Sequence, residues 1–317
     1  MNDLILIALS TFAVENRSPL ELLMASGFPY RIHSSGKRIT RDELIRLGAD
    51  AAVVVAGVEP YDADVLVRLP ALRCISRCGV GVDAIDHAAA RERGVVVANT
   101  PGIPTAAVAE LALSMMLSLT RNLHQQAASM RQRRWERLTA HLLDGRTVGI
   151  IGFGNIGTRV ADLCRAFHAR VIVSDPRFPA GAECAPGITS VAMGQLLKEA
   201  DIISIHATKT NDSGPLIGDE EIAEMKPGVV LINLARGGML DEAALVRALD
   251  SGRIGGAGLD VFVTEPYQGP LCGYDQVILT PHSATMTIET RVQMETLCVQ
   301  NAIDFLRDRL PRQNRVS

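Results

Sequence analysis

The sequence lacks the features that mark membrane and nucleic-acid-binding proteins. No apolar run reaches membrane-spanning length, and the apolar start MNDLILIALS contains no basic residue, so we expect a first β-strand there rather than a signal peptide. The formal net charge is −3, without the positive excess that nucleic acid or an anionic membrane attracts. We therefore expect a cytoplasmic protein that binds neither membranes nor nucleic acid.

Paired cysteines with metal-ligand spacing are also absent. The six cysteines stand at positions 74, 78, 164, 184, 272 and 298, and the two nearest in sequence are separated by three residues rather than two. Small buried side chains in a reducing compartment explain them better than disulfides or zinc ligands. We expect no metal site.

What the sequence does contain is typical of a globular protein of more than one domain. Of its 317 residues 47% are hydrophobic and 21% are charged, and this length favours two domains. No internal repeat, low-complexity tract or long linker interrupts it.

Short β-branched runs alternate with helical patterns, as in α/β folds with parallel sheets. In the first hundred residues we expect strands at 4–8, 51–56, 74–77 and 95–99, with helices at 41–47 and 84–93. One long helix is predicted over 105–133. Its AVAELALSMMLSL run is apolar on nearly every side, which predicts burial in a core or a subunit interface.

The alternation restarts after Gly145 and is sufficient for a complete doubly wound sheet. The strands are expected at residues 148–152, 171–175, 201–206, 229–234, 258–262 and 277–280. A final helix is predicted over 287–309. The pattern places one domain boundary near residue 100 and a return crossing near residue 284.

A glycine-rich turn follows the first strand of this second sheet. In GIIGFGNIG, at residues 149–157, the glycines Gly152, Gly154 and Gly157 fit the pattern G-x-G-x-x-G. The first permits a tight turn, the second lets the backbone approach a pyrophosphate, and the third allows close packing of helix and strand. A helix beginning near Asn155 would direct free amides at the pyrophosphate. The turn predicts a dinucleotide site.

Asp175 ends the next strand and bears on the choice of cofactor. A carboxylate there accepts hydrogen bonds from a ribose 2′-hydroxyl and repels a 2′-phosphate, so we expect NAD rather than NADP. Arg177 could hold the phosphate of NADP, but we expect it to be a solvated surface charge.

Three residues near later strand ends have side chains suited to proton and hydride chemistry. Arg236 lies in LARGG, Glu265 in TEP and His282 in PHSA. A guanidinium binds a carboxylate with two hydrogen bonds, an imidazole transfers protons near neutral pH, and a carboxylate orients the imidazole and stabilises its protonated form. Separately, each could be structural: a turn cap, a loop acid and a lone histidine. Together, beside a dinucleotide turn, they favour a catalytic set.

The chain resembles D-2-hydroxyacid dehydrogenases of the phosphoglycerate dehydrogenase-like group over nearly its whole length. The motifs that carry the resemblance, in order, are RCGVGVDAID, NTPG, VAEL, GIIGFGNIG, NLARGG, GLDVFVTEP and TPHSA. The resemblance implies an α/β fold of two Rossmann-like or flavodoxin-like parallel-sheet domains. A NAD-binding domain, residues 101–284, would be inserted into a discontinuous substrate domain, residues 1–100 and 285–317. It also implies that Arg236, Glu265 and His282 are catalytic.

Further roles follow only from the resemblance. The backbone amides of Val80 and Gly81 would join Arg236 in facing the substrate carboxylate, and the long helix after residue 104 would mediate a homodimer through the NAD domain. The remaining implied positions contact the cofactor: Asn155 and Ile156 at the pyrophosphate, Asp260 at the nicotinamide carboxamide, and Ala207, Leu234, Ala235 and Ser283 along the cofactor.

Departures from the family pattern concern the substrate. Phosphoglycerate-type members usually carry arginine and serine where this chain has Ala56 and Gly57, and asparagine near Pro104. These changes remove polar groups that would hold a distal phosphate, so 3-phosphoglycerate is disfavoured. Trp135 and Arg137 keep the family's W-x-R pattern.

The leading hypothesis is a NAD-dependent oxidoreductase that interconverts a small D-2-hydroxy acid and its 2-oxo acid. Two alternatives stay open. One is a NAD(H)-sensing interaction protein like the family's C-terminal-binding corepressors. The other is a dehydrogenase of an unusual acid, such as a phosphonate or a secondary-metabolite precursor.

Overall fold

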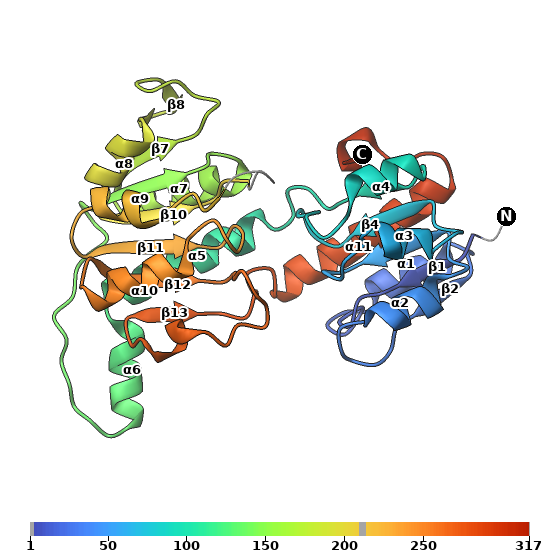
Figure 1. Cartoon of the computed structure of the whole chain (residues 1–317), viewed down its shortest axis with the longest axis horizontal. Helices are drawn as coiled ribbons and strands as arrows, with labels where there is room; N and C mark the ends of the chain where they lie inside the picture. The colour runs from blue at the N-terminus through green and yellow to red at the C-terminus, as the bar shows by residue number, and fades with distance from the viewer. Residues whose placement is uncertain (1–2, 209–213, 317) are drawn as a thin grey trace. The chain divides into compact units, whose positions relative to one another are not determined.

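A computed structural model describes residues 3–208 and 214–316, and these form two compact units (Figure 1). The first unit combines the chain up to Pro104 with the chain from Met286 onward. The second unit is the continuous segment Thr105–Thr285. The chain therefore leaves the first unit once and returns to it for its last helix.

Within the described residues, the sheet of the first unit has five parallel strands in the order β2-β1-β3-β4-β5. The central strands are apolar along their whole length because helices cover both faces of the sheet. The strand β2 was not predicted, because it is a short edge strand whose sequence, YRI, is half exposed. The bounds are β1 Ile5–Ile7, β2 Tyr30–Ile32, β3 Val53–Ala56, β4 Cys74–Arg77 and β5 Val96–Ala98.

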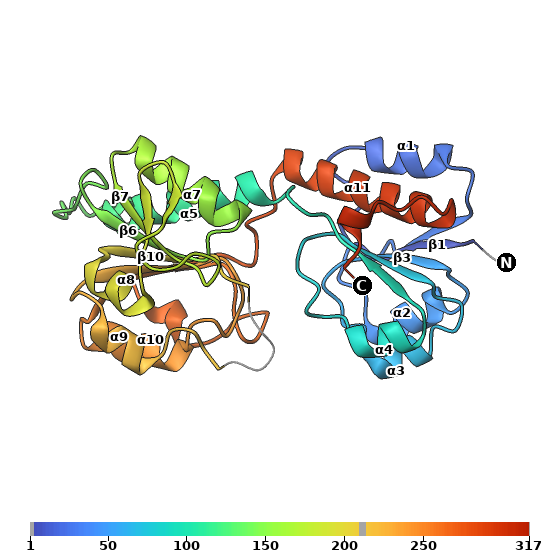
Figure 2. The same cartoon turned by 90° about the horizontal axis from the view of Figure 1, so that it is seen from above.

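Helices of the first unit pack on both faces of this sheet. Figure 2 shows α1 and α11 on one face and α2, α3 and α4 on the other. Side-chain caps define several helix starts: Thr40 forms a capping box at α2, and Asp62 and Asp86 cap α3 and α4. The bounds are α1 Ser18–Ala25, α2 Arg41–Gly48, α3 Ala63–Val67, α4 His87–Glu92, α11 Ile288–Leu306 and the 3₁₀ helix η2 Arg312–Asn314.

The second unit contains a sheet of eight strands among the described residues, in the order β13-β12-β11-β10-β6-β7-β9-β8. Its neighbouring strands are parallel except the pair β8 and β9. The bounds are β6 Thr147–Ile151, β7 Arg170–Ser174, β8 Glu183–Ala185, β9 Ile188–Ser190, β10 Ile202–Ile205, β11 Val229–Asn233, β12 Ile254–Leu259 and β13 Val277–Leu279.

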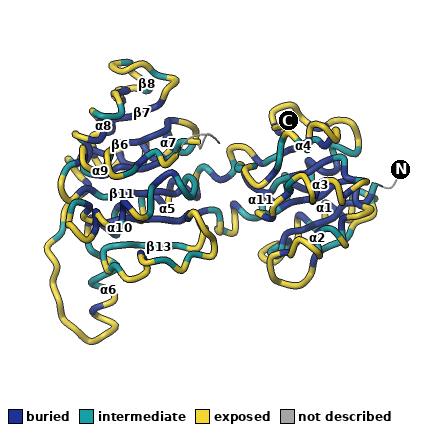
Figure 3. The backbone as a smooth tube through the Cα atoms, in the orientation of Figure 1, coloured by how far each residue is buried: buried dark blue, intermediate teal, exposed yellow. Residues whose placement is uncertain are grey.

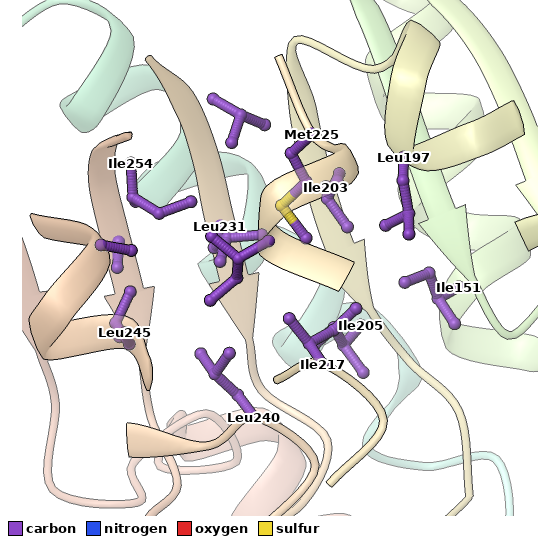
Figure 4. Close-up of a cluster of buried hydrophobic side chains, with 14 of the residues drawn as sticks. Ile151, Leu197, Ile203, Ile205, Ile217, Met225, Leu231, Leu240, Leu245 and Ile254 are labelled. Atoms are coloured by element: carbon purple, nitrogen blue, oxygen red, sulfur yellow. The ribbon is translucent and has the colours of Figure 1, made fainter. Parts of the chain in front are cut away.

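Two layers of helices enclose this sheet: α5 and α7 on one face, and α8, α9 and α10 on the other (Figure 2). Figure 4 shows the apolar cluster under the second layer, in which Leu231 and Ile203 of neighbouring strands pack together with Leu245 of α10. The bounds are α5 Thr105–Thr120, α6 Leu123–Arg131, α7 Asn155–Ala166, α8 Met193–Glu199, α9 Asp219–Glu224, α10 Glu242–Asp250 and the 3₁₀ helix η1 Pro270–Gly273.

The prediction of one helix over 105–133 is wrong, because the chain turns between α5 and α6. Asn122 adopts a left-handed backbone with φ of 48°, which asparagine tolerates better than most residues. Its side chain donates a hydrogen bond to the Thr139 carbonyl at 3.0 Å, so later chain fixes the turn. Figure 3 shows the change in environment, from the buried α5 to the more exposed α6.

The strand predicted at 258–262 begins and ends earlier than expected, as β12. The sequence of this strand, IGGAGL, has few side chains that show a strand pattern. Its glycines are needed for packing: a Cβ at Gly258 would lie 2.9 Å from the Met115 Sδ atom of α5. By contrast, the final helix is confirmed, with Thr287 as its N-cap. Among the described helices, none is both long and apolar enough to cross a membrane.

Candidate active site

The glycine-rich turn follows β6 and is shaped by close backbone approaches. Gly152 has φ of 91°, and a Cβ there would lie 2.6 Å from the Ala207 Cα atom. A Cβ at Gly157 would collide with the Gly152 carbonyl oxygen. Gly154, in contrast, has no neighbouring atom within 4 Å of such a position. The first and third glycines therefore permit packing within the protein, whereas the second leaves an open cradle.

The open cradle is bounded by the start of α7. Gly154 is the N-cap, and no side chain caps the helix. The first amides of a helix lack partners within it and lie at its positive end. Gly154 and Asn155 are exposed, and Ile156 is half-buried. These residues fit an anionic group such as the pyrophosphate of a dinucleotide.

Asp175 follows β7 as a buried carboxylate with fixed hydrogen-bond partners. It accepts from the Phe153 amide at 2.7 Å and, through both oxygens, from the Arg177 guanidinium at 3.0 and 2.9 Å. Arg177 is the main cause of a pKa well below the usual aspartate range, and the amides of Phe153 and Arg177 add to it. Asp175 is therefore ionised at neutral pH.

Arg177 lies at the surface as expected, but its charge is paired with Asp175 rather than only solvated. Its guanidinium also donates to the Phe153 carbonyl at 2.7 Å, although the side chain stays 60% exposed. Sequence reasoning missed this pairing because it depends on the conformation of the turn after the strand, which the local pattern does not predict. Here β7 ends at Ser174, and the turn that follows brings the two charges together.

The arginine turn follows β11 and is organised by Asn233. The Asn233 side chain accepts from the Ala235 amide at 3.1 Å and donates to the Arg236 carbonyl at 3.0 Å. The Arg236 guanidinium donates to the Ala235 carbonyl at 2.7 Å. A Cβ at Gly237 would collide with the Phe262 carbonyl, so this glycine lets the turn pack against the chain that follows β12. Asn233 and Gly237 were not singled out from the sequence.

His282 and Glu265 form a direct pair. The His282 Nδ1 atom lies 2.9 Å from Oε2 and 3.2 Å from Oε1 of Glu265. Glu265 Oε1 also accepts from the Phe262 amide at 3.1 Å, which fixes the carboxylate. The two side chains are 44% and 35% exposed. When Nδ1 donates to the carboxylate, the neutral ring presents Nε2 as an acceptor, as a proton-transfer group requires.

Asp260 lies fully buried beneath the His282 loop. One of its oxygens accepts from the Thr280 hydroxyl at 2.5 Å and the Ser283 amide at 2.7 Å. The other accepts from the Ala284 amide at 2.9 Å. The structure thus gives Asp260 an internal role: it holds the loop that carries His282. Its predicted contact with a nicotinamide carboxamide stays a prediction.

Replacing Asp260 with asparagine should disturb this loop, because the amide NH₂ group would face a donor. We expect kcat to fall about ten- to a hundredfold through misplacement of His282, and the free energy of unfolding to fall by about 1–3 kcal/mol. Steady-state kinetics and chemical denaturation measure the two effects. Asp162→Asn, at an exposed position of α7, is the matched control. An Asp260→Asn variant with unchanged activity would contradict the positioning role.

His206, directly after β10, was not predicted as a site residue. Its Nε2 atom lies 2.8 Å from the Ser204 hydroxyl. Its Nδ1 atom is buried without a hydrogen-bond partner among the residues that the structure describes. Burial lowers the pKa of the ring to about 4.

This depressed pKa predicts a loss of stability in acid. Below about pH 6.5 the His206 ring is protonated in the unfolded chain but stays neutral in the folded chain. The free energy of unfolding should therefore fall as the pH drops toward 4. The full effect is about 3 kcal/mol. Denaturant titrations across this range should show a shallower pH dependence for His206→Gln than for the wild type. His141→Gln, at an exposed histidine, is the control. Parallel profiles for the wild type and His206→Gln would refute the assignment.

The candidate residues of the second unit come together because they follow parallel strands at one sheet edge. Ligands of such sheets bind beyond the carboxyl ends of the strands. Ala207 follows β10, Leu234 and Ala235 follow β11, and Ser283 lies beyond β13, joined to Asp260 after β12.

Val80 and Gly81 belong to the first unit, in the loop after β4. The Gly79 amide donates to the Thr100 hydroxyl at 3.0 Å, and the Asn99 side chain donates to the Val80 carbonyl at 2.9 Å. The NTPG run therefore anchors this loop. Its predicted contact with a substrate carboxylate stays a prediction.

Comparison with known proteins shows the family of this chain. The family model described as D-isomer specific 2-hydroxyacid dehydrogenase, NAD binding domain, matches residues 113–284. This chain belongs to the D-isomer specific 2-hydroxyacid dehydrogenase family. A hydroxypyruvate reductase of Thermotoga maritima is 38% identical to this chain over 264 residues. The match covers 81% of this chain and 85% of the relative.

Other relatives of this chain differ in length. A D-3-phosphoglycerate dehydrogenase of Mycobacterium bovis is 40% identical over 255 residues, or 79% of this chain. The match spans only 48% of that relative's length. Among solved structures, a D-lactate dehydrogenase from Aquifex aeolicus complexed with NAD and lactic acid superposes with a TM-score of 0.84 at 27% identity. The match covers 99% of this chain and 98% of that one.

Proposed function

We propose that this protein is a NAD-dependent oxidoreductase that interconverts a D-2-hydroxy acid and its 2-oxo acid. The observation that carries the proposal is the His282–Glu265 pair, which lies at the same sheet edge as Arg236 and the glycine-rich turn. An acid–base pair, a guanidinium and a dinucleotide cradle are together the groups that proton-coupled hydride transfer requires.

Each protein group has a separate task in the proposed reduction. Arg236 holds the substrate carboxylate, together with the amides of Val80 and Gly81, and polarises the adjacent carbonyl. NADH, when bound, supplies the hydride. His282 gives its Nε2 proton to the carbonyl oxygen while Glu265 stabilises the imidazolium. In the oxidative direction, His282 takes the hydroxyl proton instead.

The chain's own residues define where the cofactor would be held. Gly154, Asn155 and Ile156 offer the open cradle and free amides for the pyrophosphate. Asp175 offers a carboxylate for ribose hydroxyls and opposes a 2′-phosphate. The residues proposed to line the remaining length are Ala207, Leu234, Ala235, Asp260 and Ser283. Residues 101–284 would then be the NAD-binding domain, and residues 1–100 with 285–317 the substrate domain.

A substrate panel tests the proposal. Purified protein is mixed with NADH or NADPH and a set of 2-oxo acids, and absorbance at the nicotinamide band is followed. We expect turnover of at least one 2-oxo acid with NADH and weaker turnover with NADPH. Tight NADH binding with no turnover across the panel would support a NAD(H)-sensing protein instead.

We also infer a homodimer formed through the second unit. The support is a set of exposed apolar side chains on α6 and in the chain between α6 and β6, which a monomer would leave in water. Light scattering of the purified protein measures the oligomeric state directly. The exposed apolar residues are Leu123, Met130, Trp135, Leu138 and Leu142.

The cysteines, all of which the structure describes, form no disulfide, which fits the proposed cytoplasmic location.

A further inference from the structure

The sheet of the first unit has a point at which a ligand is expected. Its order, β2-β1-β3-β4-β5, reverses direction between β1 and β3. In open parallel sheets, ligands bind at this reversal, beyond the carboxyl ends of the two strands. The chain that follows β3 runs from Gly57 to Tyr61, and its residues therefore border the expected ligand position.

A buried carboxylate occupies this position. Glu59 is only 4% exposed, and its Oε1 atom accepts from the Gly57 amide at 2.9 Å and from the Tyr61 hydroxyl at 2.8 Å. Tyr61 is completely buried. Burial and the adjacent Glu59 charge raise the pKa of Tyr61 well above its usual range, so the hydroxyl stays a donor to the carboxylate.

The second carboxylate oxygen fills the space above Gly57. A Cβ at Gly57 would lie 2.8 Å from Glu59 Oε2 and 3.4 Å from the Leu9 Cδ2 atom, just beyond β1. A side chain at position 57 and the observed orientation of Glu59 therefore exclude each other. On the other side, the Cys78 amide donates to the Ala56 carbonyl at 2.8 Å, which ties this segment to the Val80 loop.

We propose that Glu59 determines substrate selectivity: it restricts the enzyme to 2-oxo acids whose reacting carboxylate is their only anionic group. This inference rests on the proposed function and names its substrate class. Glu59 disfavours a second anion in two ways. Its charge repels a phosphate or a distal carboxylate. Its side chain also takes the volume that a residue binding such a group would need at position 57.

Two basic side chains act near Glu59. The Arg38 guanidinium donates to the Val58 carbonyl. Arg77, at the end of β4, donates to the Cys78 carbonyl, and its charge partly opposes the rise in the pKa of Tyr61. Its charge offsets part of the Glu59 field. The steric block above Gly57 is independent of that offset.

Two substrate pairs test the proposal in the full-length enzyme. One pair is hydroxypyruvate and 3-phosphohydroxypyruvate. The other is 2-oxosuccinate and its 4-amide, which differ by one charge at almost equal size. The wild type should favour the monoanion of each pair by at least about tenfold in kcat/KM, mainly through KM. Glu59→Gln keeps the acceptor for Gly57 and Tyr61 but loses the charge, and should reduce the preference in the isosteric pair about tenfold.

The matched control is Glu21→Gln, at an exposed acid of α1, which should leave both ratios unchanged. A wild type that prefers the more highly charged member of each pair, or a folded Glu59→Gln with unchanged ratios, would overturn the selectivity role while leaving the proposed function intact. The wild-type comparison does not depend on the folding of a variant. Failure to reduce any 2-oxo acid would instead overturn the proposed function, and this inference with it.

Discussion

Replacing His282 with asparagine should lower kcat by about 10²–10⁴, the usual contribution of a general acid–base group. Asparagine is chosen because His282 has a left-handed backbone with φ of 50°, and asparagine tolerates this conformation better than alanine. The variant therefore separates loss of proton transfer from backbone strain. Steady-state kinetics with the best substrate of the panel measure kcat, and NADH titration should show unchanged cofactor affinity.

The control for this substitution is His141→Asn, which makes the same chemical change at an exposed histidine outside the site. It should retain wild-type activity. Normal turnover by His282→Asn would show that another group transfers the proton. A variant inactive only because NADH no longer binds would likewise contradict the assigned role.

The second large effect concerns the cofactor. Asp175→Asn should shift the ratio of kcat/KM values for NADPH and NADH by at least about a hundredfold toward NADPH. The substitution removes the charge that opposes a 2′-phosphate, and it releases the Arg177 guanidinium from its ion pair at 2.9 Å. The amide oxygen still accepts from the Phe153 amide, so the turn after β6 should keep its shape.

The double variant Asp175→Asn with Arg177→Gln identifies the source of the shift. If the released guanidinium binds the phosphate, the double variant should lose most of the gain with NADPH. Should Asp175→Asn keep the wild-type cofactor ratio, the carboxylate would not be the discriminating group. Both variants are compared at equal ionic strength, because screening weakens exposed charge interactions.

Local sequence patterns predicted most of the fold because buried parallel strands are continuous apolar runs. The runs VVVA and VVLIN became β3 and β11, and the final helix, predicted over 287–309, is α11, Ile288–Leu306. The missed elements have weak local patterns. The pair β8 and β9 is short and partly exposed, and the turn at Asn122 interrupts an otherwise helical pattern without a glycine or proline.

For the site, the sequence predicted residue types and strand ends but not the contacts between side chains. The glycine spacing and the positions of Glu265 and His282 followed from motifs, and the structure places the latter two in contact. The internal bonds of Asp260 and the coverage of Asp175 by Arg177 could not be predicted, because they depend on how separate loops approach in space.

The buried bonds of Asp260 also bear on the mechanics of proton transfer. Because this single carboxylate joins the end of β12 to Thr280, Ser283 and Ala284, the imidazole of His282 is carried by a segment braced against a neighbouring strand. A motion of this segment that displaced the imidazole would therefore have to break hydrogen bonds to Asp260. The position of the imidazole is thereby fixed relative to the parallel sheet, although the histidine side chain remains open to solvent.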